Sequence, residues 1–107
     1  MYCDIIAEMG SELGSMFPVE LTEDQAREAG KNPGTVAAIR KATSLNDGSY
    51  GWIQVLGEES PRLRYWYPQT DGTIVLKAAA PDFPDMRIPK DDINVLGSVV
   101  MVIGTVG

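Results

Sequence analysis

The sequence predicts a mainly β domain, a coiled sheet or partly open barrel with one short helix in its N-terminal half. Residues 91–103 are an acidic entry followed by a nearly unbroken β-branched run. Because residues 99–103 are apolar at every position, they predict a closing strand that protein covers on both faces. Residues 62–67 alternate between two sets of side chains, as a strand does. The Asp71-Gly72 turn leads from them to residues 73–78 and predicts a hairpin.

The length and composition indicate one domain without disulfides or zinc. A chain of 107 residues buries enough surface to fold alone. We expect residues 1–34 to form an N-terminal strand or helix region and residues 35–107 to form the β-rich core. Cys3 is the only cysteine, and there is no histidine. Zinc sites built from Cys and His, Ser-His-Asp triads and Cys-His pairs are therefore excluded.

Each remaining element has a local signal. Residues 1–15 have apolar side chains at helical spacing interrupted by two glycines, which predicts a short strand or a frayed helix. Residues 21–29 predict a helix, because Thr22 and Gln25 can form a capping box and Gly30 can end it. The other predictions are strands at 35–39 and 50–56, a turn at 46–49, a loop at 57–61, an irregular connection with three prolines at 81–89, and a bulge or close backbone approach at Gly97-Ser98.

Residues 21–41 also fit a second interpretation, a helix-turn-helix, which would make the chain a small DNA-binding regulator. Gln25-Ala26, Gly30, Val36 and Ile39 have the spacing with which two such helices pack together. Pro33-Gly34 at the start of the second helix argues against it. The net charge of −6 does so too, because the nine Lys and Arg are scattered among fifteen carboxylates, whereas phosphate contacts need clustered cations. We do not expect nucleic acid as a partner.

Aromatic residues in the segment 62–67 suggest an interface. Tyr65 and Tyr67 share one face of the predicted strand and Trp66 lies on the other, so we expect the two tyrosines in the core. If Trp66 is exposed beside Trp52, a contact surface framed by charged side chains becomes the better interpretation. The residues predicted for an interface are Trp52, Arg62, Arg64, Trp66, Val99 and Met101.

Neither a metal site nor a membrane segment is predicted. Asp82, Asp85, Asp91 and Asp92 offer oxygen ligands, but they lack the ligand spacing of an EF-hand, so we expect solvated loop carboxylates and no metal or cofactor. No apolar run approaches the ~18 residues that a membrane helix needs. With Asp4 where a secretory leader would be basic, we expect a cytoplasmic protein that is not attached to a membrane.

Six segments occur in an order that is more informative than any one of them: residues 45–48, 50–56, 63–67, 71–76, 80–84 and 91–103. In this order and spacing they resemble the C-terminal domain of LexA-type repressors and their phage relatives, which are self-cleaving serine–lysine peptidases. The resemblance implies a coiled sheet or partly open barrel.

The sequence departs from that family at the catalytic positions. In its active members a Ser-Met pair precedes the turn and a lysine lies in a later strand, whereas residues 38–44 here lack the pair and the strand has Arg62 or Arg64. Arginine keeps its proton with a pKa above ~12 and cannot act as the neutral base. Ser44 lies too close to the turn to match. The resemblance therefore implies a degenerate, non-catalytic member with no catalytic residues.

In that family the domain also joins repressor subunits. We therefore expect a non-catalytic interaction and oligomerisation domain with a regulatory role, which forms a homodimer or larger assembly or binds a host or phage protein. Because the sequence begins at Met1 with no room for a separate DNA-binding domain, a phage structural or accessory protein, or an inhibitor of a host protein, stays an alternative.

Overall fold

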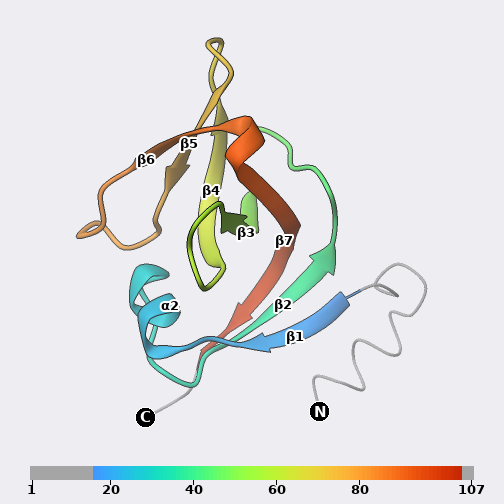
Figure 1. Cartoon of the computed structure of the whole chain (residues 1–107). Helices are drawn as coiled ribbons and strands as arrows, with labels where there is room; N and C mark the ends of the chain where they lie inside the picture. The colour runs from blue at the N-terminus through green and yellow to red at the C-terminus, as the bar shows by residue number, and fades with distance from the viewer. Residues whose placement is uncertain (1–15, 105–107) are drawn as a thin grey trace.

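Seven antiparallel strands form a single curled sheet in residues 16–104, the part of the chain that the computed structural model describes (Figure 1). The strands follow the order β1-β2-β7-β3-β4-β5-β6 across the sheet. Their bounds are β1 Met16–Glu20, β2 Val36–Lys41, β3 Tyr50–Val55, β4 Arg62–Pro68, β5 Thr73–Lys77, β6 Met86–Pro89 and β7 Ile93–Ile103. One short helix, α2 (Glu23–Glu28), and one 3-10 turn, η2 (Lys90–Asp92), complete the fold. The prediction of a mainly β, partly open sheet is confirmed.

The closing strand β7 is the centre of the sheet, because it pairs with β2 on one side and with β3 on the other. Its register slips twice: Leu96 has no partner on β3, and Val100 has none on β2. These are the two-against-one positions of β-bulges. A Cβ atom at Gly97 would lie 2.7 Å from the carbonyl oxygen of Arg40, so the predicted bulge and close backbone approach are both confirmed.

We expected protein to cover both faces of β7 as far as its end, and the structure shows that it does not. Val100 is 38% exposed and Met101 is 43% exposed. The apolar run therefore extends beyond the part of β7 that other residues cover. The prediction of two covered faces over residues 99–103 is wrong.

Helix α2 begins as the sequence predicts. The Thr22 hydroxyl accepts a hydrogen bond from the N–H of Gln25 at 3.2 Å, and the Gln25 side chain accepts one from the N–H of Thr22 at 2.9 Å. Gly30 follows with φ +71°, a conformation that suits glycine. The second helix of the helix-turn-helix interpretation is instead strand β2, so that interpretation of residues 21–41 is wrong as a structure.

Two hydrophobic clusters lie on opposite faces of the sheet around β3. The first packs beneath α2 and includes Ala26, Ile39, Trp52 and Leu63. The second fills the curl of strands β3 to β6 and consists of Ile53, Val55, Trp66, Ile74 and Leu76. Successive residues of a strand point to opposite faces, which is why Trp52 and Ile53 belong to different clusters.

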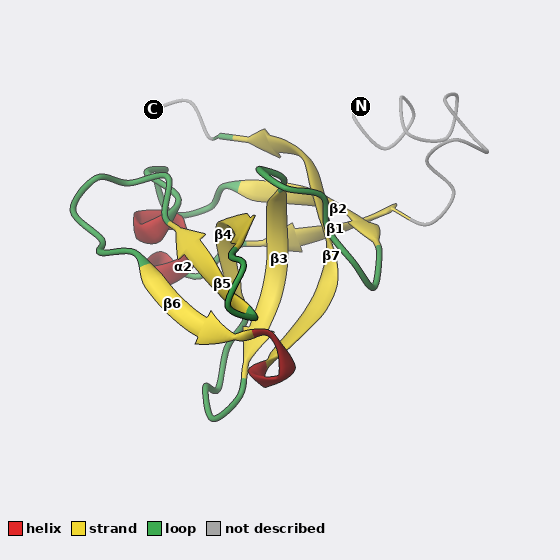
Figure 2. Cartoon of the chain, turned by 90° about the horizontal axis from the view of Figure 1, so that it is seen from above, coloured by secondary structure: helices red, strands yellow, loops and turns green. Residues whose placement is uncertain are grey.

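Three other expectations change. Residues 81–89 include strand β6, which pairs with β5 and turns through η2 into β7 (Figure 2). Strand β1 was not predicted and pairs with β2. Trp66, 4% exposed, is in the core, whereas Tyr65 and Tyr67 are half-buried, the reverse of the prediction. The prediction for residues 1–15 lies outside the described residues, and no helix within residues 16–104 is long and apolar enough to cross a membrane.

Candidate functional site

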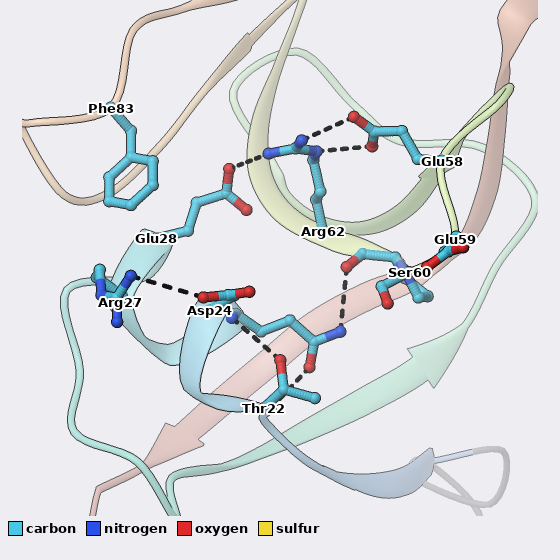
Figure 3. Close-up of a pocket in the computed structure, with 11 residues that line it drawn as sticks. Thr22, Asp24, Arg27, Glu28, Glu58, Glu59, Ser60, Arg62 and Phe83 are labelled. Atoms are coloured by element: carbon cyan, nitrogen blue, oxygen red, sulfur yellow. Dashed lines mark hydrogen bonds and ion pairs between the residues drawn. The ribbon is translucent and has the colours of Figure 1, made fainter.

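A cleft of about 460 Å³ lies between α2 and the loop that leads from β3 to β4 (Figure 3). Residues from both halves of the helix and its cap residue Thr22 line the cleft, and the ring of Phe83 lies on the side opposite the loop. Charged side chains dominate the lining, with four carboxylates and two guanidinium groups. The charged lining residues are Asp24, Arg27, Glu28, Glu58, Glu59 and Arg62.

Glu28 forms the inner end of the cleft and is 4% exposed. Only one of its two carboxylate oxygens, Oε2, accepts hydrogen bonds from the described residues: one from Arg62 and two from Arg64. The backbone carbonyl of Glu28 accepts a further bond from the N–H of Ala80 at 3.1 Å. The last turn of α2 is thereby fixed to β4 and to the segment after β5.

Arg64 is a guanidinium in the core, with 2% of the residue exposed. Its Nε lies 3.0 Å from Glu28, and a second nitrogen donates to the carbonyl oxygens of Leu76 at 3.0 Å and Pro84 at 2.9 Å. A buried charge is tolerated when it is paired and its other N–H groups find acceptors. Arg64 meets both conditions, so its first role is to join α2, β4, β5 and the start of the β6 segment.

Arg62 closes the other side of the cleft. Its Nε and one terminal nitrogen each lie 2.7 Å from Glu58, a two-pronged contact that matches the planar guanidinium to the carboxylate. The hydrogen bond to Glu58, followed by the charge of Glu28, raises the pKa of Arg62, against the opposing effect of burial. Arg62 therefore stays charged, and its positive charge is already matched by these two carboxylates.

The loop of residues 57–61 is held to the helix by Gln25, whose side-chain amide donates to the carbonyl of Pro61 at 3.1 Å. Gln25 thus serves two purposes, since its amide oxygen also caps the helix. The cleft has a defined shape because this bond and the ion pair between Glu28 and Arg62 join the helix to the loop and to the start of β4.

A second candidate is an apolar surface that we name the outer face. It consists of the side chains of β1, β2 and residues 98–103 that point away from the first hydrophobic cluster. The paired rows assign to it Met16, Pro18, Glu20, Val36, Ala38, Arg40, Ser98, Met101 and Ile103, with the bulge residue Val100 beside them. Its centre is the row Pro18, Ala38 and Met101, and its charged members lie at opposite ends.

A second cavity, of about 590 Å³, opens where strands β4, β5 and β7 meet the loop before β3. Ser44 and Lys90 both line it, and both are exposed. No hydrogen bond joins these two side chains, and within residues 16–104 no three His, Cys, Asp or Glu side chains gather as metal ligands would.

The structure separates the six residues predicted for an interface. Trp52 and Trp66 are buried on opposite faces of the sheet, and Arg64 is in the core, so these three have almost no surface for a partner. Val99 packs against the first cluster. Arg62 lines the cleft and Met101 lies on the outer face, and for both the predicted contact stays a prediction.

Sequence reasoning missed Glu28, Pro18 and Val100 as site residues. The signal for Glu28 was its position three residues after Gln25, on the same side of a helix whose other carboxylates are in the first turn. For Pro18 and Val100 no local signal exists, because the strand pairing decides which face each one joins. A comparison of the whole chain with protein-family models finds no match.

Proposed function

We propose that the chain is a non-catalytic protein-association domain that forms a homodimer by packing the outer face of one copy against the outer face of another. The observation that supports this is the exposure of two apolar side chains of β7, Val100 at 38% and Met101 at 43%, on the face where Pro18 is also exposed, whereas Ala38 between the strands is 1% exposed. Two sheets pack face to face about 10 Å apart and bury such side chains between them. The resemblance to LexA-type C-terminal domains, which join repressor subunits, agrees with this function.

Packing of faces is favoured over pairing of strand edges. The two outermost strands of the described sheet are β1 and β6, and each contains a proline, Pro18 and Pro89. Proline has no N–H to donate to an added strand, and it is a common protection of sheet edges. The free edges are therefore poor templates for an added strand, whereas the outer face offers apolar side chains for face-to-face packing.

The charges at the rim favour a second copy as the occupant. Glu20 lies at one end of the outer face and Arg40 at the other, on neighbouring strands. A twofold axis between the two sheets and perpendicular to the strands places each Glu20 near Arg40 of the other copy. Such an interface is self-complementary, as twofold dimers require.

We expect a dimer at micromolar concentration by size-exclusion chromatography with light scattering. Met101→Glu introduces a charge at the centre of the interface and is expected to weaken dimerisation by more than about tenfold. Leu56→Glu is the matched control, since Leu56 is 75% exposed elsewhere on the molecule. A wild-type chain that stays monomeric, or two variants that behave alike, would contradict the proposal.

A charge exchange tests the orientation. Glu20→Arg alone is expected to weaken the dimer by about two- to fivefold, the range for exposed ion pairs. Glu20→Arg combined with Arg40→Glu restores the pairing and the affinity if the axis is perpendicular to the strands. A double variant weaker than both single variants would contradict this orientation.

The non-catalytic part of the proposal has its own test. Ser44 and Lys90 are solvated, so nothing there desolvates a lysine amine into a base. We expect the chain to stay intact during incubation at alkaline pH, as measured by mass spectrometry. Time-dependent cleavage that Ser44→Ala abolishes would show a peptidase instead.

A further inference from the structure

We propose that Met101 is an oxidation site, at which hydrogen peroxide converts the thioether to a sulfoxide and thereby weakens the homodimer. The inference rests on the proposed function, because it names a regulation of the same outer face. Three features of Met101 support it: its exposure in the single copy, the small side chains beside it, and its place at the centre of the outer face.

Among the methionines of residues 16–104, Met101 is the exposed one. It is 43% exposed, whereas Met16 and Met86 are half-buried. Met86 also packs against the second hydrophobic cluster. In a single copy, an oxidant in solution therefore reaches the sulfur of Met101 more readily than the other two.

The side chains beside Met101 are too small to cover it. Its partner on β2 is Ala38, and the partner of Ala38 on β1 is Pro18. Neither side chain is long enough to fold over the end of a methionine. In the proposed dimer, the outer face of the second copy replaces the solvent above this row, so that the sulfur becomes buried.

The chemical step transfers one oxygen atom to the sulfur. The sulfur of Met101 donates an electron pair to one oxygen of hydrogen peroxide, an S–O bond forms, and the O–O bond breaks. The second oxygen leaves as water after it takes up the proton of the first. Sulfur is oxidised by two electrons and the peroxide is reduced by two, which gives the sulfoxide.

The sulfoxide opposes dimerisation because it is polar where the interface is apolar. Neither the proline ring of Pro18 nor the methyl group of Ala38 has a hydrogen to donate to its oxygen, and a buried acceptor without a donor is unfavourable. The twofold axis introduces this oxygen twice. We expect the dimer to weaken by more than about tenfold. Conversely, the dimer shields the sulfur, so Met101 reacts chiefly in the dissociated copy.

The test treats the full chain with dilute hydrogen peroxide, removes the peroxide with catalase, and adds a thiol reductant so that no disulfide through Cys3 joins two copies. Peptide mapping by mass spectrometry measures the sulfoxide at each methionine, and light scattering measures dimerisation. We expect Met101 to be oxidised before Met16 and Met86, and more slowly as the protein concentration rises. Methionine sulfoxide reductases should restore the dimer.

Two variants are each compared with themselves before and after the treatment. Met101→Leu should dimerise equally in both states, whereas Met86→Leu should lose affinity as the wild type does. Equal losses in the two variants, or a rate of Met101 oxidation that does not depend on protein concentration, would overturn the inference. A chain that is monomeric before treatment contradicts the dimer and this inference together, whereas a dimer that survives full oxidation of Met101 contradicts this inference alone.

Discussion

The most informative single residue is Arg64. It lies in β4, directly before three aromatic residues, and the sequence does not distinguish it from the exposed arginines of the chain. Its burial is possible because its guanidinium donates four hydrogen bonds, two of them to backbone carbonyls that belong to different segments. A residue type that is usually exposed thus links several segments in the core of this protein.

Tyr50 provides a prediction at the same scale. Its hydroxyl is the one buried side-chain atom without a hydrogen-bond partner in residues 16–104, and its ring stacks on Tyr65 with centroids 4.4 Å apart. Burial, followed by the neighbouring Tyr65 and Glu28, raises the pKa of Tyr50 from 10.0 to about 12. The unfolded chain therefore loses this proton first, and stability should fall as the pH rises from about 10 to about 12.

Tyr50→Phe should remove much of this pH dependence, measured as the free energy of unfolding in urea. At neutral pH the variant should lose no more than about 0.5 kcal/mol, because the removed hydroxyl is not bonded in the native state. A large loss at pH 7 would show that the hydroxyl has a partner in the folded protein, and an unchanged alkaline slope would show that groups other than Tyr50 cause the pH dependence.

At the scale of elements, the two bulges of β7 determine where its side chains point. Gly97→Ala should destabilise the fold by about 1–3 kcal/mol, because the new Cβ would meet Ile39 and the carbonyl of Arg40. Thermal unfolding measures the effect. Gly104→Ala is the control, since a Cβ there meets nothing within 4 Å, and equal effects of the two variants would contradict the close approach at Gly97.

The elements that the sequence predicted are those with local signals. Helix α2 has its cap, and the hairpin of β4 and β5 has the Asp71-Gly72 turn, where Asp71 accepts hydrogen bonds from Thr73. Strands β1 and β6 were missed because each is short, includes a proline, and exists only through its pairing with a neighbour. The helix-turn-helix prediction was wrong although its local signal was present. Val36 and Ile39 have the spacing of a helix, but they lie in strand β2.

At the scale of the whole molecule, the sequence predicted the class of fold but not which faces are covered. Trp66 and Tyr67 exchange their expected environments because the sheet curls around the face that Trp66 occupies. The cleft could not be predicted either, because Glu28 and Arg64 are 36 residues apart in the chain and meet only after the sheet has formed. The outer face arises in the same way, from three strands that are distant in sequence.

The position of β7 also has a consequence for protein synthesis. Strands β2 and β3 follow one another in the chain but are not neighbours in the sheet, since β7 lies between them. Without β7, the pieces β1-β2 and β3-β4-β5-β6 are not paired with each other, because β7 pairs with both β2 and β3 in the described sheet. We therefore expect the facing edges of β2 and β3 to stay open during synthesis until β7 is available to pair with both of them.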